Sequence, residues 1–295
     1  MMKGISGKET PYKQNDFSDL LRHHVNVCSK VINRHSWASQ FYQYFDMFGG
    51  PGLILDNGKT IEGSPVIFSK VIREFPILYR ANIVEQDKAI FAQLKATVQN
   101  QHIKLHYGNS GEIYKSLLIS NSKQFGLLYL DPDMSEDGFD LSFKIARDFA
   151  LCYPRLDILL YVSANNIKRI AGAKDTPCLV DRLRPIQKTD WVIRTLRDKF
   201  QYTFLIGTNY SKPFTWGSRG FFDARSPQGQ AILERANYTD KQIKKKHQPP
   251  LPHLTGLMQS TSDIPYLELS EQKRFGGLGG YVKDAIKGQL RKFIT

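Results

Sequence analysis

Four polar side chains stand at the ends of strand-like segments, where they could hold a nucleoside and an amine. Asp46 ends the aromatic run that begins at Phe41, and Glu85, Asn109 and Asp131 each follow a later strand-like segment. Carboxylates accept hydrogen bonds from ribose hydroxyls and from amines, and a side-chain amide can pair with the amino group of a base. Open α/β sheets bind ligands at the carboxyl ends of their strands. These four positions therefore predict one binding site.

A glycine-rich turn follows Asp46. Residues 49–52 are Gly-Gly-Pro-Gly, residues 62–65 are Glu-Gly-Ser-Pro, and residues 66–74 have a helical pattern. A strand, a glycine-rich turn and a helix together let the backbone approach a nucleoside closely. The dinucleotide fingerprint and the phosphate-loop pattern are both absent, and the alternative is a turn that binds no ligand. The residues that we expect to contact a bound cofactor are Asp46, Gly49, Gly50, Gly52, Glu85 and Asn109.

Strand-like and helix-like segments alternate around these residues. This alternation predicts an α/β fold with a Rossmann-type sheet. The run 125–130 is apolar almost throughout, so we expect it to be buried on both faces. Helices are expected at 16–37, at 87–100 and around 191–200. The strands that we expect after the first one span 77–84, 103–107, 125–130, 157–162 and 201–206.

Glu85 and Asn109 each have a second interpretation. An acid after the second strand is placed to accept hydrogen bonds from both ribose hydroxyls, as in dinucleotide-binding folds. Glu85 could instead neighbour a helix N-cap, although Asp87 is better placed for that role. Asn109 is placed to read the amino group of adenine, but a turn residue of this type can equally bond to its own backbone.

The candidate reaction centre is the segment Asp131, Pro132, Asp133 and Met134. It resembles the motif of methyltransferases that act on amino groups of nucleic-acid bases, which has an acid or amide, two prolines and an aromatic residue. The resemblance implies that Asp131 and the carbonyl of Pro132 hold the amine of a flipped-out base. Asp133 replaces the second proline and is a candidate general base, while Met134 replaces the ring. The alternative is a simple turn after a buried strand.

Positive charge is concentrated in the second half of the chain. The whole chain has 41 Lys and Arg against 28 Asp and Glu, a formal net charge of +13. Residues 1–160 contain 18 against 17, whereas residues 161–295 contain 23 against 11. A one-sided excess is typical of nucleic-acid binding, although a solvated basic face has the same composition.

Rings and cations alternate within this basic half. Residues 214–225 interleave aromatic side chains with arginines, and residues 244–246 are three lysines. Rings stack on bases and cations hold phosphates, but these rings could also fold back onto the core. The residues that we expect to contact nucleic acid are Trp216, Arg219, Phe222, Arg225, Lys244, Lys245 and Lys246.

The three cysteines, Cys28, Cys152 and Cys178, are scattered without the spacing of metal ligands. We therefore expect free thiols and no metal site. No apolar run approaches the roughly 18 residues of a membrane helix, and the start of the chain has no signal-peptide core, so we expect no membrane association and a cytoplasmic protein.

Three parts are expected: an N-terminal helical segment at 1–37, an α/β domain at 38–210, and a basic, aromatic-containing extension at 211–295.

Residues 45–52 and 61–65 resemble the opening of the three-Cys-motif partner family, and the resemblance continues at 129–132 and 157–169. It covers residues 20–210 and implies a methyltransferase-like Rossmann fold with S-adenosyl-L-methionine as its cofactor. An Asp before a Gly-Gly-Pro-Gly turn is also similar to the first motif of S-adenosylmethionine-dependent methyltransferases, which implies that Asp46 holds the ammonium of the cofactor. The family resemblance further implies a protein partner that carries a cysteine motif.

Two classes of function stay open. The first is an S-adenosylmethionine-dependent methyltransferase that acts on the amino group of a base in DNA or RNA. The second is a non-catalytic, cofactor-binding module that serves a protein partner. The cofactor residues favour the first class, and the altered segment 131–134 favours the second. A third possibility, base methylation through a cysteine thiolate, would use Cys178 after Pro177, but no motif after the fourth strand supports it.

Overall fold

The computed structural model describes residues 8–36, 38–56, 58–132, 135–173, 179–197, 201–210 and 216–246. The chain divides into two compact units, Met1–Lys246 and His247–Thr295. All the described residues belong to the first unit. Asp133, Met134 and Cys178, which the sequence analysis singles out, lie outside the described residues.

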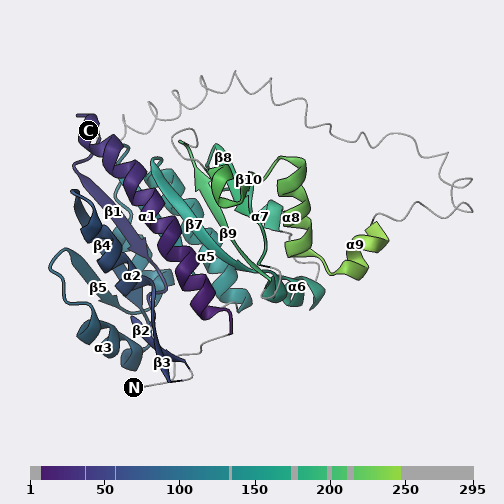
Figure 1. Cartoon of the computed structure of the whole chain (residues 1–295), viewed down its shortest axis with the longest axis horizontal. Helices are drawn as coiled ribbons and strands as arrows, with labels where there is room; N and C mark the ends of the chain where they lie inside the picture. Colours follow the sequence, from purple (N-terminus) through teal and green to yellow (C-terminus); the bar gives the residue numbers. More distant parts are fainter. Residues whose placement is uncertain are drawn as a thin grey trace, which may run out of the picture. The chain divides into compact units, whose positions relative to one another are not determined.

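An eight-stranded sheet forms the centre of the first unit (Figure 1). The strands β5, β4, β1, β6 and β7 run parallel to one another, β9 runs antiparallel between β7 and β8, and β10 is antiparallel to β8. In spatial order they are β5 (Ile103–Tyr107), β4 (Leu78–Glu85), β1 (Phe41–Asp46), β6 (Phe125–Leu130), β7 (Leu156–Ser163), β9 (Tyr202–Thr208), β8 (Asp190–Arg194) and β10 (Phe221–Asp223).

The order of the strands reverses beside β1. From β1 the chain adds β4 and β5 on one side, and then returns to place β6 on the other side. Doubly wound sheets bind ligands outside the carboxyl ends of the strands at such a switch point. Asp46 is the last residue of β1, and Asp131 follows the last residue of β6. The predicted α/β, Rossmann-type sheet is confirmed, and both carboxylates stand at its switch point.

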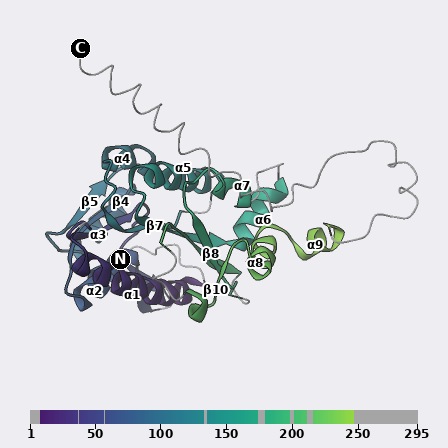
Figure 2. The ribbon, with the colours of Figure 1, turned by 90° about the horizontal axis from the view of Figure 1, so that it is seen from above.

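The central strands are buried because helices cover both faces of the sheet. Every residue of β6 is buried, as its apolar sequence predicts, and full burial of a Leu or Phe side chain contributes about 1.5–3 kcal/mol. The helices α1 (Thr10–Arg34) and α2 (Ser64–Val71) lie on one face, and α4 (Ser110–Leu117) and α5 (Glu136–Cys152) lie on the other (Figure 2).

Helix α1 belongs to the same compact unit as the sheet. Phe17, Leu21 and Val25 repeat at helical spacing and are completely buried. Asp16 connects the helix to the segment from β8 to β9: its carboxylate accepts hydrogen bonds from Arg197 Nη2 at 2.6 Å and the Tyr202 hydroxyl at 2.7 Å. Arg194 Nη1 lies 3.0 Å from the same group.

The remaining elements surround this core. Between β1 and α2 the chain forms a hairpin of β2 (Leu53–Asp56) and β3 (Lys59–Glu62). No helix of the described residues is long and apolar enough to cross a membrane. The other helices are η1 (Ile72–Glu74), α3 (Lys88–Thr97), α6 (Ala164–Ala173), α7 (Leu179–Leu183), η2 (Trp216–Arg219), α8 (Pro227–Asn237) and α9 (Asp240–Lys246).

The structure differs from the sequence-based expectation around Trp191. A helix was expected at 191–200, but residues 190–194 form β8 instead. The six-membered part of the Trp191 indole packs against Gly207 on β9, where a Cβ would come within 2.7 Å of the ring. Because a glycine on the neighbouring strand accepts this ring, the apolar Trp-Val-Ile run is stable as an antiparallel strand. Helix α1 also differs: it begins at Thr10, before the expected start at residue 16.

Candidate functional site

A cavity of about 500 Å³ opens where the carboxyl ends of β1, β4 and β6 meet. Four of the residues predicted from the sequence line it, namely Gly50, Glu85, Asn109 and Asp131. Each of them lies at or just after the carboxyl end of a different parallel strand, namely β1, β4, β5 and β6. The cavity falls within the size range of small-molecule sites. Its other lining residues are Met47, Phe48, Val84, Gln86, Asp87, Ile90, Ser110, Ser135, Asp137, Gly138 and Leu141.

Glu85 joins the end of β4 to the glycine-rich turn. Its Oε2 accepts a hydrogen bond from the backbone N–H of Gly50 at 2.9 Å, and its Oε1 accepts one from the backbone N–H of Asp87 at 2.7 Å. The residue is 9% exposed. Each carboxylate oxygen can accept more than one hydrogen bond, so Glu85 holds the turn and still has acceptor capacity toward the cavity.

The glycines of the turn are required by its geometry. A Cβ at Gly49 would come within 2.5 Å of Ile83 Cγ2, and the Gly49 N–H donates to the Val84 carbonyl at 2.8 Å. Gly50 and Gly52 have φ angles of +66° and +76°, which side chains with a Cβ rarely adopt. Gly50 lines the cavity, whereas Gly49 and Gly52 shape the turn without lining it.

Asp46 lies beneath the turn and is completely buried. Its carboxylate accepts hydrogen bonds from Ser64 Oγ at 2.6 Å, from the Phe48 N–H at 3.1 Å and from the Tyr44 hydroxyl at 3.3 Å. Burial raises the pKa of Asp46 to about 7, although the hydrogen bonds from Ser64 and Phe48 oppose the shift. Asp46 does not line the cavity; it connects β1 to the start of α2, directly behind the turn.

Asn109 is the N-cap of α4. Its Oδ1 accepts a hydrogen bond from the Gly111 N–H at 2.7 Å, and its Nδ2 donates to Gln86 Oε1 at 3.4 Å. The neighbouring Ser110 hydroxyl donates to the carbonyl of Met47. The local backbone role considered from the sequence is therefore present, and Asn109 also lines the cavity.

Asp131 forms an ion pair that the sequence analysis did not find. Its Oδ2 lies 2.8 Å from Lys13 Nζ and also accepts a hydrogen bond from the Tyr129 hydroxyl at 3.2 Å. The Lys13 ammonium lies 4.6 Å from the centre of the Tyr161 ring, which is a cation–π distance. The side chains of Lys13 and Asp131 are each 15% exposed. Pro132, which follows, is buried.

The predicted nucleic-acid contacts do not share one environment. The Trp216 ring is 5% exposed and packs against His23 and Phe221, with centroid distances of 5.1 and 5.4 Å. The alternative interpretation, in which rings fold back onto the core, describes this residue. Phe222 is 36% exposed and Arg219 is exposed.

Several cations of the basic half are already paired with acids. Arg225 Nη2 lies 2.9 Å from Asp190 and 3.0 Å from Asp223. Arg194 and Arg197 pair with Asp16 as described above. Lys244 is exposed on α9, and the side chains of Lys245 and Lys246 on the same helix lie outside the described ones. No group of three or more potential metal-ligating side chains occurs among the described residues.

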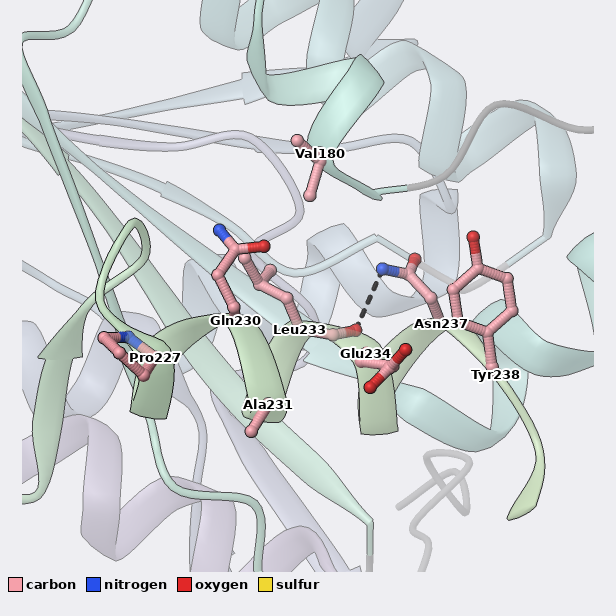
Figure 3. Close-up of a pocket in the computed structure, with 8 residues that line it drawn as sticks. All are labelled: Val180, Pro227, Gln230, Ala231, Leu233, Glu234, Asn237 and Tyr238. Atoms are coloured by element: carbon pink, nitrogen blue, oxygen red, sulfur yellow. Dashed lines mark hydrogen bonds between the residues drawn. The ribbon is translucent and has the colours of Figure 1, made fainter. Parts of the chain in front are cut away.

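A second cavity, of about 380 Å³, lies between α7 and α8 (Figure 3). Asn237, one of its polar lining residues, is occupied by two hydrogen bonds within the fold. Its Nδ2 donates to the Leu233 carbonyl at 2.9 Å, and its Oδ1 accepts from the Leu179 N–H at 2.8 Å. None of the site residues predicted from the sequence lines this cavity. The cavity at the strand ends is therefore the better candidate.

Comparisons with known proteins give low similarity throughout. No family model and no curated protein matches the chain. Protein LPL1258 from Legionella pneumophila is 12% identical with a TM-score of 0.48, covering 75% of this chain and 93% of that one. The human methyltransferase 10 domain containing protein is 13% identical with a TM-score of 0.41, covering 70% and 86%.

A third solved structure, M. jannaschii TYW2 in complex with AdoMet, is 9% identical with a TM-score of 0.38, covering 69% of this chain and 76% of that one. At these values the strand order and the cavity, rather than the neighbours, carry the interpretation of this chain. The three-Cys-motif partner family is not shown by the comparisons, and it stays a resemblance.

Proposed function

We propose that this chain is an S-adenosyl-L-methionine-dependent methyltransferase whose acceptor is an amino group of a nucleic-acid base. One observation carries the proposal: Gly50, Glu85, Asn109 and Asp131, chosen from the sequence for this chemistry, line a single cavity at the switch point of the sheet. Glu85 and Asn109 also hold backbone groups nearby, so it is the gathering of all four residues at one opening that supports the proposal.

The cofactor end of the cavity is formed by the loops after β1, β4 and β5. Glu85 accepts hydrogen bonds from the two ribose hydroxyls, in addition to those that it accepts from the backbone N–H groups of Gly50 and Asp87. Asn109 pairs with the adenine through the edge of its amide that faces the cavity. Gly49, Gly50 and Gly52 keep the turn flat enough for the methionine part, and Asp46 provides the balancing negative charge behind it.

Asp131 acts at the acceptor end. When bound, the cofactor supplies a sulfonium methyl group that an amine can attack. The Asp131 carboxylate accepts a hydrogen bond from the acceptor amine, orients its lone pair toward the cavity, and stabilises the positive charge that develops on nitrogen. Pro132 adds its carbonyl as a second acceptor, and Asp133 is the proposed general base. Arg219 and Lys244, which are exposed, are the proposed contacts for phosphates.

The second candidate is a non-catalytic, cofactor-binding module. The ion pair favours it, because Lys13 already occupies the carboxylate that the acceptor amine would use. In that case a partner, such as the cysteine-motif protein implied by the family resemblance, would depend on cofactor binding but not on methyl transfer.

Calorimetry with S-adenosylmethionine and S-adenosylhomocysteine tests cofactor binding. Loss of two charge-assisted hydrogen bonds in Glu85→Ala should weaken binding by about 30- to 1,000-fold. Glu85→Gln keeps an acceptor for the turn and should lie between. Glu112→Ala, an exposed acid on α4, is the matched control and should bind like the wild type. Absence of heat from the wild type at millimolar ligand would refute the proposal.

Transfer of labelled methyl groups to DNA, RNA and protein pools separates the two candidates. A methyltransferase of nucleic acid labels DNA or RNA and leaves protein unlabelled. If the cofactor binds and no pool is labelled, the non-catalytic module is the correct description.

A further inference from the structure

A third cavity, of about 460 Å³, lies on the face of the sheet that carries α4 and α5, toward the amino ends of β1, β4 and β5. Its floor is formed by Gln43 and Phe45 from β1 and Asn82 from β4. Leu117 at the end of α4 and Tyr153 after α5 form its walls. None of its lining residues lines the cavity proposed for the cofactor.

The sheet is polar on this face, which is unusual for parallel strands. In β4 and β5 polar and apolar residues alternate, and the register places Asn82 beside Lys104 and Arg80 beside Gln43. Parallel strands covered by helices are normally apolar on both faces, as β6 is here. Helix α4 has only 8 residues and ends at Leu117. The amino-terminal half of this face is therefore left open to a ligand.

The charge of the cavity has one sign. Arg80, His102 and Lys104 line it, and no acid among the described residues does so. All three are exposed at the rim. The carbonyl end of α4, which would repel an anion, is partly neutralised because the Tyr153 hydroxyl donates to the Leu117 carbonyl at 2.6 Å. The cavity therefore attracts anions.

Its floor contains an amide that is open to the cavity. Gln43 is 8% exposed and lines the cavity, and its side chain makes no hydrogen bond to the described residues. The Gln43 amide atoms are not among the buried, unpaired side-chain atoms of the described residues, so they are open to the cavity and can pair with a ligand or with water. Asn82 Oδ1 is bonded to His106 Nε2 at 3.0 Å, which directs the Asn82 amino group away from that histidine.

We infer that this cavity is a second binding site, for a phosphate-bearing nucleotide unit. Arg80 and Lys104 bind the phosphate at the rim, and the amides of Gln43 and Asn82 pair with the polar edge of the base at the floor. The apolar walls, Leu117 and Tyr153, contact the flat faces of the base. The phosphate can come from a free nucleotide or from one unit of a single-stranded nucleic acid.

This inference does not rest on the proposed methyltransferase activity, because the two cavities share no residue. A site here would hold a nucleotide unit at the opposite end of the strands from the reaction centre. If the substrate is a single-stranded nucleic acid, that nucleotide would lie outside the segment that enters the reaction centre.

Binding of AMP, of inorganic phosphate and of a fluorescent single-stranded 12-nucleotide RNA to the full chain tests the inference. Arg80→Ala with Lys104→Ala should weaken AMP binding by about 10-fold or more, because two charge-assisted contacts are lost. The matched control is Lys59→Ala with Lys95→Ala, which removes two exposed lysines elsewhere on the first unit and should bind AMP like the wild type. Gln43→Leu should weaken AMP but not inorganic phosphate, since it alters only the base-binding floor.

The RNA distinguishes the two sources of phosphate. If the site binds a unit of single-stranded nucleic acid, the RNA binds at least 10-fold more tightly than AMP. In the Arg80/Lys104 variant the slope of log K against log salt for the RNA should then fall by about one unit. If it serves a free nucleotide, AMP competes fully with a fluorescent AMP analogue and the RNA does not. Equal AMP affinity for the wild type, the Arg80/Lys104 variant and the Gln43 variant would overturn the inference, provided that circular dichroism shows that all are folded. Failure of the wild type to bind AMP and RNA would overturn it as well.

Discussion

Lys13 Nζ and Asp131 Oδ2 lie 2.8 Å apart, although 118 positions separate them in the sequence. The lysine reaches the carboxyl end of β6 from the first turns of α1, and its ammonium faces the Tyr161 ring. A carboxylate with an aromatic face beside it is a good site for an ammonium group. Lys13 therefore occupies the position that the proposed function assigns to the acceptor, and an acceptor amine must compete with it.

Lys13→Met should raise methyl transfer at subsaturating acceptor, because it frees Asp131 without adding charge. The same variant should lower the free energy of unfolding by about 1–3 kcal/mol, since a mostly buried carboxylate loses its partner. Lys13→Arg keeps an ion pair and should stay close to the wild type in both measurements. A fall in transfer by Lys13→Met with unchanged cofactor affinity would show that Lys13 assists the reaction instead of blocking it.

Asp131→Ala should lower turnover by about 100-fold or more and leave cofactor affinity nearly unchanged, because the carboxylate acts mainly in the transition state. Single-turnover kinetics and calorimetry on the same preparations measure the two effects. Asp137→Ala, which changes another acid lining the cavity, is the control and should be milder. Turnover that survives in Asp131→Ala would place the reaction centre elsewhere.

Asp46 should make stability depend on pH. Its pKa rises from 3.8 to about 7 on burial, so between these values the folded chain holds a proton that the unfolded chain has lost. The free energy of unfolding should therefore fall as the pH rises from 4 to 7, by at most about 4 kcal/mol at 1.36 kcal/mol per pKa unit. Asp46→Asn should remove this decline in urea unfolding measured across the range. An unchanged decline would assign it to another group.

The same carboxylate predicts proton release on cofactor binding. A cofactor ammonium near Asp46 favours the charged form, so binding at pH 6.5 should release part of a proton. Calorimetry in buffers with different ionisation enthalpies measures it, and Asp46→Asn should abolish the buffer dependence. Identical heats in all buffers for the wild type would contradict a cofactor charge at this position.

The basic half should give salt-dependent binding to nucleic acid. Changing Lys244, Lys245 and Lys246 to Ala should reduce the slope of log K against log salt by about two to three units, because each neutralised phosphate releases counterions. Arg225→Ala should have little effect, since Asp190 and Asp223 already neutralise that guanidinium. Affinity that is indifferent to salt in the wild type would show a solvated basic surface.

The apolar run of β6 located that strand because burial on both faces leaves a clear signal in the sequence, and the polar residue at the end of each expected strand marked the edge where the cavity forms. Trp191 was placed in a helix because the packing that makes it a strand depends on Gly207, a residue that only the sheet brings near. The sequence does not say whether the Trp216 ring faces the solvent or the core, because that depends on its contacts with His23 and Phe221. Lys13 left no local signal because its partner belongs to a distant strand end.

The bonds of Asp16 to Arg197 and Tyr202 set an order of events during synthesis. Arg197 and Tyr202 lie 181 and 186 positions after Asp16 in the sequence. The first helix therefore leaves the ribosome long before these two residues are made. Helix α1 can pack against β1, α2 and β6 as soon as these are made, but the bonds of Asp16 cannot form until Arg197 and Tyr202 have been made. Contacts of such sequence separation slow folding. Truncation before β8 would thus leave the earliest part of the chain without its anchor.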